Sequence, residues 1–169
     1  MFAVFLFFSA MFGIIFSAKL TWIYFFWEVT TLCSFIMIGY SRKQEAFNNS
    51  FRALWMLMLG GAGFVGAIIY ASRELGTINL FEIVKMEQSM VLLPVVLICL
   101  AGINKAAQFP FSQWLLGAMV APTPSSALLH SSTMVKAGVY ICLRCSPAIT
   151  DTWAGGTLAM VGGVSFLIA

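Results

Sequence analysis

The chain consists almost entirely of apolar runs, each about as long as a helix that crosses a lipid bilayer. A helical span needs about 20 predominantly apolar residues, and hydrocarbon tolerates only structures that satisfy their own backbone hydrogen bonds. The runs cover residues 1–17, 20–40, 51–70, 91–108, 124–144 and 153–169. This pattern predicts an all-α membrane protein, a bundle of about six transmembrane helices that forms a single domain over residues 1–169.

The composition excludes a soluble fold. Only 9% of the 169 residues are charged and 61% are apolar, whereas soluble domains carry about a quarter charged residues. The polar surface is too small to cover a water-soluble globule, which argues against a soluble enzyme. The formal net charge of +3 is too small for the basic surface that nucleic-acid binding requires. We therefore expect lipid, and no nucleic acid, around this chain.

Three prolines interrupt the apolar pattern in the second half of the chain: Pro110, Pro122 and Pro124. Proline removes a backbone donor and clashes with the preceding turn of a helix. We expect the fourth span to break near Gln108, a short helix to follow over residues 111–119, and the next span to begin at Pro124. A break at membrane depth requires protein or water to satisfy the backbone. This segment is therefore the first candidate for an ion site, as in transporters with interrupted helices.

Four ionisable residues fall within the predicted spans: Glu28, Lys105, His130 and Lys136. An acid or a base at the centre of a transmembrane helix costs about 2.5–3.5 kcal/mol, so each must pair, become neutral or face water. These four residues are the candidate proton relay. The alternative for Glu28 is a carboxyl that only holds helices together. The alternative for Lys105 is a side chain that snorkels to the membrane surface.

The polar residues of the run 124–144 share one face if that run is a continuous helix. At about 100° per residue, one stripe holds Ser126, His130, Thr133, Lys136 and Tyr140. A lone histidine in this position is more often a packing residue. A histidine and a lysine on one stripe with three hydroxyls indicate a hydrated relay, in which Ser126, Thr133 and Tyr140 support the two titratable groups.

Other motifs carry little functional signal. The chain has one His, and Asp151 is its only Asp, so a Ser/His/Asp hydrolase or a His-ligated metal site cannot readily be assembled. Cys142 and Cys145 form a C-x-x-C without a second pair, which favours packing between helices over a metal or redox role. A G-x-G-x-x-G pattern within the residues 61–66 lies inside a predicted span. Small residues there favour close helix approach over nucleotide binding.

The stretch from Asn104 to Tyr140, NKAAQFPFSQWLLGAMVAPTPSSALLHSSTMVKAGVY, resembles the signature of the antiporter-like proton-pumping membrane subunits. These subunits occur in respiratory complex I, energy-converting [NiFe] hydrogenases and Mrp-type cation/proton antiporters. The residues 26–28, together with Cys33, Ser34 and 38–40, resemble the glutamate-bearing helix of the same family. The sequences of residues 52–55 and 111–114, together with the combination of His130 and Lys136, look closest to the hydrogenase branch.

The resemblance implies roles for the four ionisable residues. Glu28 would pair with Lys105 of the broken helix, and Lys136, with His130 on the same helix, would be the central relay. A glutamate and a lysine placed close together form a switchable couple, because the charge on each changes the proton affinity of the other.

The resemblance also implies the architecture and the partners. The chain would be one half of an inverted-repeat antiporter-like fold, with a second broken helix beyond Ala169, so that 1–169 is a partial domain. No cofactor is expected in this chain, and iron-sulfur, nickel or flavin groups would belong to partner subunits. The expected partners are other membrane and hydrophilic subunits of a multi-subunit complex in a prokaryotic cell membrane. The transported ion would be the proton, with sodium as the alternative.

Four hypotheses for the function remain open at this point. The first is a non-redox transport subunit of a redox-driven proton pump, of the complex I or energy-converting hydrogenase type. The second is a subunit of an Mrp-type sodium/proton antiporter, driven by an ion gradient. A structural membrane anchor would use the same charges only as contacts between helices. An intramembrane enzyme lacks a nucleophile and base pair.

Overall fold

The computed structural model describes residues 2–41, 43–121, 123–129 and 133–168. These residues form helices and no strand, which confirms the expected all-α class. The helices are α1 (Phe2–Phe16), α2 (Leu20–Ile38), α3 (Gln44–Tyr70), α4 (Leu80–Ile83), α5 (Gln88–Lys105), α6 (Gln113–Gly117), α7 (Thr123–Ala127), α8 (Met134–Ile149) and α9 (Trp153–Ile168).

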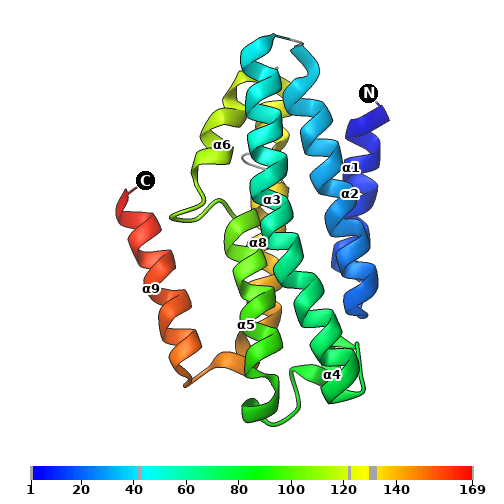
Figure 1. Cartoon of the computed structure of the whole chain (residues 1–169), viewed down its shortest axis with the longest axis vertical. Coiled ribbons are helices and arrows are strands. Elements are labelled where there is room, and N and C mark those ends of the chain that lie inside the picture. Colours follow the sequence, from blue (N-terminus) through cyan, green and yellow to red (C-terminus); the bar gives the residue numbers. More distant parts are fainter. Residues whose placement is uncertain (1, 42, 122, 130–132, 169) are drawn as a thin grey trace.

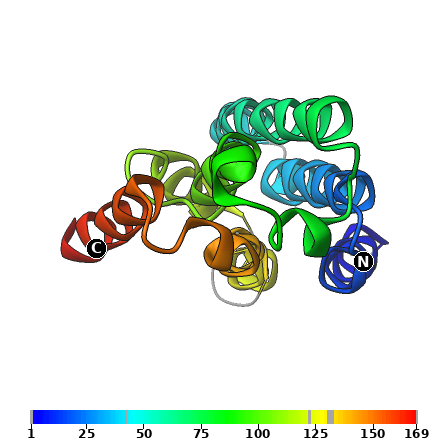
Figure 2. The same ribbon diagram turned by 90° about the horizontal axis from the view of Figure 1, so that it is seen from below.

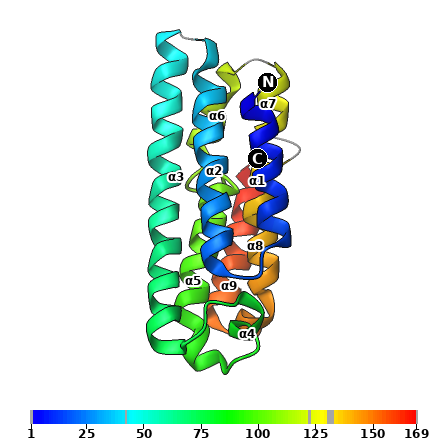
Figure 3. The same cartoon turned by 90° about the vertical axis from the view of Figure 1, so that its right-hand side faces the viewer.

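The helices form an elongated bundle. The helix α1 packs on α2, α3 packs on both α2 and α5, and α5 packs on α8. The short helices α6 and α7 lie near the end of the bundle where α2 joins α3, while α5 and α8 fill the opposite half (Figures 1 and 3). The helix α9 lies at one edge of the bundle, far from α1 (Figure 2).

The number of full-length spans differs from the expectation of about six. Among the described residues, three helical stretches are long and apolar enough to cross a membrane: Leu20–Ser41, Gln44–Leu75 and Gln88–Lys105. The helices at the two ends, Phe2–Phe16 and Trp153–Ile168, are apolar but shorter. The runs 20–40, 51–70 and 91–108 therefore form long helices as expected. The difference in the count comes from the two shorter terminal helices and from the run 124–144.

The run 124–144 is divided rather than continuous. Its first part is α7, which ends at Ala127, and its second part is α8, which starts at Met134 and extends to Ile149. Thr133, directly before α8, has φ −141° and ψ −60°, outside the helical region. The single helical phase that placed Ser126 and Tyr140 on one stripe is therefore not maintained, because the rotation of 100° per residue holds only within an unbroken helix.

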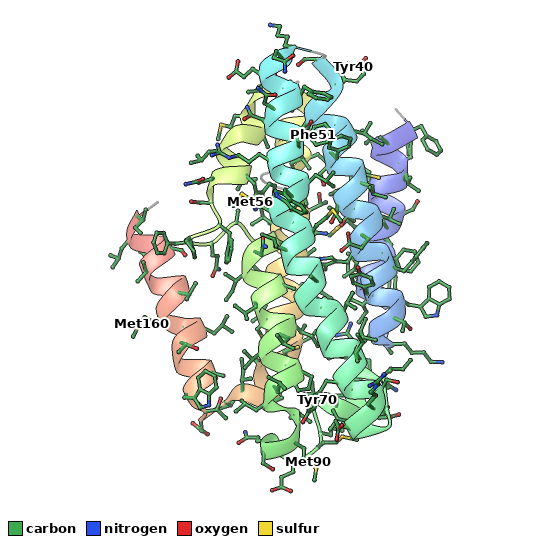
Figure 4. All side chains as sticks on the ribbon, viewed as in Figure 1. Tyr40, Phe51, Met56, Tyr70, Met90 and Met160 are labelled. Atoms are coloured by element: carbon green, nitrogen blue, oxygen red, sulfur yellow. The ribbon has the colours of Figure 1, made fainter. Side chains whose placement is uncertain are left out.

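The buried core is mostly apolar and the outer surface is apolar as well. Trp27 and Trp114 are among the largest buried side chains, while large hydrophobic side chains also cover the outside. Met160 of α9, for example, is 70% exposed and points away from the rest of the bundle (Figure 4). An exterior of this kind is expected of helices that are surrounded by lipid.

Candidate functional site

Lys105 is the last residue of α5 and is completely enclosed. Its side chain is 1% exposed. The ammonium Nζ donates hydrogen bonds to the carbonyl oxygen of Trp27 at 2.7 Å and to Oγ1 of Thr31 at 3.2 Å. It also lies 4.3 Å from the centroid of the Trp27 ring, where an aromatic face attracts a cation. The snorkelling alternative for Lys105 therefore does not apply, because its ammonium binds inside the bundle.

Glu28 directly follows Trp27 on α2 and is half-buried. Its Oε1 is buried and has no hydrogen-bond partner. A side chain at Gly61 of α3 would collide with this oxygen, so α3 packs tightly against the carboxyl group. Trp27, whose carbonyl binds the Lys105 ammonium, directly precedes Glu28 along α2. The structure thus brings the two residues together, although the ammonium bonds to Trp27 and Thr31 and not to Glu28 Oε1.

A set of buried hydroxyls on α2 surrounds the carbonyl of Trp27. Thr30 and Thr31 donate to that carbonyl at 2.7 Å and 3.1 Å. Ser34 donates to the carbonyl of Thr30 and contacts Sδ of Met134, the first residue of α8, at 3.2 Å. Sequence reasoning missed these hydroxyls as site residues. Their position within about two turns after Glu28 on an otherwise apolar helix is the signal that could have found them.

Asn104 is a further residue that sequence reasoning missed. It is 3% exposed, and its Nδ2 donates to the carbonyl of Met56 on α3 at 2.7 Å. Its own backbone carbonyl accepts from the indole nitrogen of Trp114 on α6 at 3.0 Å. Asn104 therefore joins α3, α5 and α6 next to Lys105. The signal in the sequence that could have found it is an asparagine directly before an intramembrane lysine.

The chain leaves the helix earlier than expected around Pro110. The helix α5 ends at Lys105 and not near Gln108, and α6 covers only Gln113–Gly117. Between them Ala107 has a positive φ of 52°, and the peptide bond before Pro110 is cis. The buried indole of Trp114 bonds back to the end of α5, so protein satisfies part of the backbone that the break leaves free.

The structure describes only one of the other two prolines. Pro122 lies outside the described residues, and Pro124 falls within α7.

The predicted relay around Lys136 is only partly described. His130 lies outside the described residues. Ser126 is in α7 and partly buried, and Thr133 donates from Oγ1 to the carbonyl of Leu128 at 2.9 Å. Lys136 is on α8 and exposed.

Lys136 lines an apolar groove between α8 and α1. The groove has a volume of about 410 Å³, and its lining includes Thr133, Lys136 and Tyr140 from α8 with Phe12 and Ile15 from α1. The hydroxyl of Tyr140 donates to the carbonyl of Ile15 at 3.0 Å. Lys105 is instead enclosed against α2. The structure therefore places Lys105 close to Glu28 inside the bundle, whereas Lys136 lies exposed in the groove between α8 and α1.

Metal ligands and thiols add little to the site. Within the described ranges, no group of three or more His, Cys, Asp or Glu side chains is arranged to hold a metal ion. All four cysteines are free thiols. Cys142 of α8 contacts the carbonyl of Cys99 of α5 at 3.7 Å, which fits the expected packing role between two helices.

Comparison with known proteins identifies related sequences. A family model described as NADH:quinone oxidoreductase/Mrp antiporter, transmembrane, matches residues 17–169. The Na(+)/H(+) antiporter subunit A1 of Staphylococcus saprophyticus is 37% identical over 172 residues, which cover 97% of this chain and 21% of that protein. A Na(+)/H(+) antiporter subunit of Bacillus subtilis is 38% identical over 156 residues, covering 88% and 20%. The chain thus spans about one fifth of the length of these curated relatives.

Two solved structures contain a similar arrangement of helices. The Mrp complex from a Dietzia species has a chain with a TM-score of 0.82 and 35% identity, over 90% of this chain and 17% of that chain. The membrane-bound sulfane sulfur reductase, an archaeal respiratory membrane complex, gives a TM-score of 0.83 at 21% identity, over 95% and 34%. At that identity the second likeness shows the fold alone.

Proposed function

The chain belongs to the NADH:quinone oxidoreductase/Mrp antiporter transmembrane family, and from this premise we propose that it is the Glu/Lys-bearing part of an Mrp-type Na⁺/H⁺ antiporter subunit. The family and the bacterial relatives make it a multi-pass integral protein of a prokaryotic cell membrane. The relatives that match 97% of the chain are named as components of Na(+)/H(+) antiporters. Their names support the Mrp branch over the hydrogenase branch, which the sequences of residues 52–55 and 111–114 favour.

The observation that carries the proposal is the binding of the Lys105 ammonium inside the bundle. Its bonds to the Trp27 carbonyl and to Thr31 hold the charge one residue away from Glu28 along α2. A proton can pass between a buried amine and a nearby half-buried carboxyl inside the membrane, since the charge on each group alters the proton affinity of the other. Lys105 and Glu28 are therefore the proposed entry of a proton path.

The path would continue through His130 and Lys136, as the family resemblance implies. Lys136 lies exposed in a groove of this chain, and an ammonium inside a membrane is stable only against polar groups or water. Other parts of the complex are the proposed source of those groups. The similar solved chains come from multi-subunit membrane complexes, which supports partner subunits for this chain as well.

The test uses the complete antiporter complex that contains this chain, reconstituted in lipid vesicles. A Na⁺ gradient is imposed and proton flux is followed with a pH-sensitive dye. We expect Lys105→Ala and Glu28→Gln each to lower the flux at least tenfold, because each removes one partner of the couple. Lys85→Ala, a change of an exposed lysine between α4 and α5, serves as the control with wild-type flux.

Two outcomes would reject the proposal. Wild-type flux in both variants would remove Lys105 and Glu28 from any proton path. A loss of thermal stability in proportion to the loss of flux would support a structural anchor, in which the charges only hold helices together.

A redox-driven pump is the second candidate function, because the fold is shared with an archaeal respiratory membrane complex. In that case vesicles would move protons only when an electron donor is supplied and would not respond to a Na⁺ gradient. The same reconstituted complex, assayed with and without the donor, distinguishes the two candidates.

A further inference from the structure

Two buried oxygen atoms at the junction of α2, α3 and α5 have no hydrogen-bond partner: Glu28 Oε1 and Asn104 Oδ1. The orientation of the Asn104 amide is fixed, because Nδ2 must face the carbonyl of Met56, which can only accept. Oδ1 is therefore the free atom. Buried acceptors almost always bind a donor, a water or an ion, so two of them at one junction point to a ligand.

The side chains that carry the two oxygens lie against consecutive residues of α3. A side chain at Gly60 would meet Asn104 Nδ2 at 2.9 Å, and one at Gly61 would collide with Glu28 Oε1. Successive Cα atoms are about 3.8 Å apart, so the amide of Asn104 and the carboxyl of Glu28 lie beside the same turn of α3. The absence of side chains at these two glycines is what lets the carboxyl and the amide approach the same part of α3.

The chemistry of the junction suits a small cation. Oε1 of ionised Glu28 and Oδ1 of Asn104 can only accept, and both lie near the carboxyl end of α5, where the helix dipole favours positive charge. The Lys105 ammonium does not fill this role, because it bonds to the Trp27 carbonyl and to Thr31. Sodium ions in transporters with interrupted helices bind to such oxygens at the ends of half-helices.

We propose that Glu28 Oε1 and Asn104 Oδ1 are two ligands of a Na⁺ site at the break of α5, and that Na⁺ and the proton on Lys105 occupy the junction alternately. This inference rests on the function proposed above and names the residues that bind its Na⁺. Water supplies the remaining ligands. Asn104 becomes a binding residue that the family resemblance did not indicate.

Charge balance explains the alternation. The ionisable groups that interact electrostatically with Lys105 are Glu28 and Cys33, and Tyr24 interacts with Glu28. A net charge enclosed among helices is costly, so ionised Glu28 retains one compensating cation. That cation is either the ammonium of Lys105 or Na⁺ beside neutral Lys105. Replacing one by the other takes up one Na⁺ and releases one proton.

The experiment measures the Na⁺ concentration that gives half-maximal antiport in vesicles that contain the complete complex. We expect Asn104→Ala to raise this concentration at least tenfold, because one ligand is lost, while Lys105 remains available for the proton. Trp114→Phe is the matched control. It removes the hydrogen bond to the Asn104 backbone and leaves Oδ1 in place, so the half-saturating Na⁺ concentration changes less than twofold.

A binding measurement covers the case in which Asn104→Ala assembles poorly. Binding of radioactive Na⁺ to the detergent-purified complex is compared between wild type, Glu28→Gln and Asn104→Ala at equal protein concentration. We expect both variants to lose the same site and wild type to bind less Na⁺ as the pH falls.

The outcomes separate this inference from the proposed function. Unchanged Na⁺ dependence in Asn104→Ala, or Na⁺ binding that is equal in all three proteins, overturns the Na⁺ site even when Lys105→Ala abolishes antiport. Wild-type antiport in Lys105→Ala instead overturns the proposed function itself. Loss of Na⁺ affinity in Asn104→Ala but not in Trp114→Phe supports the site.

Discussion

The carbonyl oxygen of Trp27 is the most heavily used acceptor of the candidate site. It receives hydrogen bonds from the side chains of Thr30 and Thr31 and from Lys105. Hydrogen bonds with a charged donor contribute about 1.5–3 kcal/mol, more than neutral ones. The ammonium therefore has a defined position beside Glu28, which a lysine surrounded only by apolar groups would not have.

A matched pair of substitutions tests the role of the hydroxyls at the residue scale. Thr31→Val is expected to lower proton flux about threefold to tenfold, because it removes the hydroxyl that contacts Lys105 and thereby part of a charge-assisted bond. Thr30→Val removes a hydroxyl that bonds to the same carbonyl but does not contact Lys105. Its flux should stay within about twofold of wild type. Flux assays on the reconstituted complex compare the two, and equal effects would contradict the assigned contact.

At the scale of elements, α5 and α8 approach each other closely near Gly138 and Gly102. A side chain at Gly138 would clash with the Gly102 carbonyl and with the backbone nitrogen of Ala106. Both obstacles are backbone atoms, so the helices can accommodate a methyl group only by separating. This contact holds the end of α5, and therefore Lys105, at its depth in the bundle.

We expect Gly138→Ala to destabilise the protein by about 1–3 kcal/mol through overpacking. The thermal unfolding midpoint of the detergent-purified protein is the measurement. Gly156→Ala on α9 is the control, because no atom lies within 4 Å of the added methyl group and alanine is the better helix former. A midpoint for Gly138→Ala at or above that of Gly156→Ala would show that the two helices are not in tight contact.

For the whole molecule, the described residues place charged connections at two opposite ends of the bundle (Figures 1 and 3). Lys43 lies between α2 and α3, whereas Lys85 lies between α4 and α5. Lys19 pairs with Asn79 through an isolated backbone bridge, which ties the α1–α2 connection to the segment before α4. An odd number of membrane crossings therefore separates Lys43 from the other two lysines.

Labelling from one side of the membrane tests this topology. With Lys43→Cys, Lys85→Cys and Lys19→Cys variants, a membrane-impermeant maleimide applied to intact cells should label either the first or the last two, never all three. All three positions are exposed, while the native thiols are buried or half-buried, so the background is low. Labelling of Lys43→Cys and Lys85→Cys from the same side would show that α3 does not cross the membrane.

The amino-acid sequence by itself determined the class of the fold and the residues that need a partner. The lengths of the apolar runs predicted the all-α bundle, because hydrocarbon admits only backbone that satisfies itself. The cost of an intramembrane charge singled out Glu28 and Lys105 before any partner was known. Both inferences depend on local properties of the chain, so they required no knowledge of which helices touch.

Only the tertiary structure decided which atoms those charges meet. Lys105 binds Trp27, which lies 78 positions away in the sequence, and Asn104 binds Met56, which lies 48 positions away. Local sequence patterns carry no information over such separations. The same holds for the run 124–144, where a departure from helical angles at Thr133 changes the direction of every later side chain. Helical periodicity predicts faces within one element, whereas the packing of several elements selects the partner of each polar group.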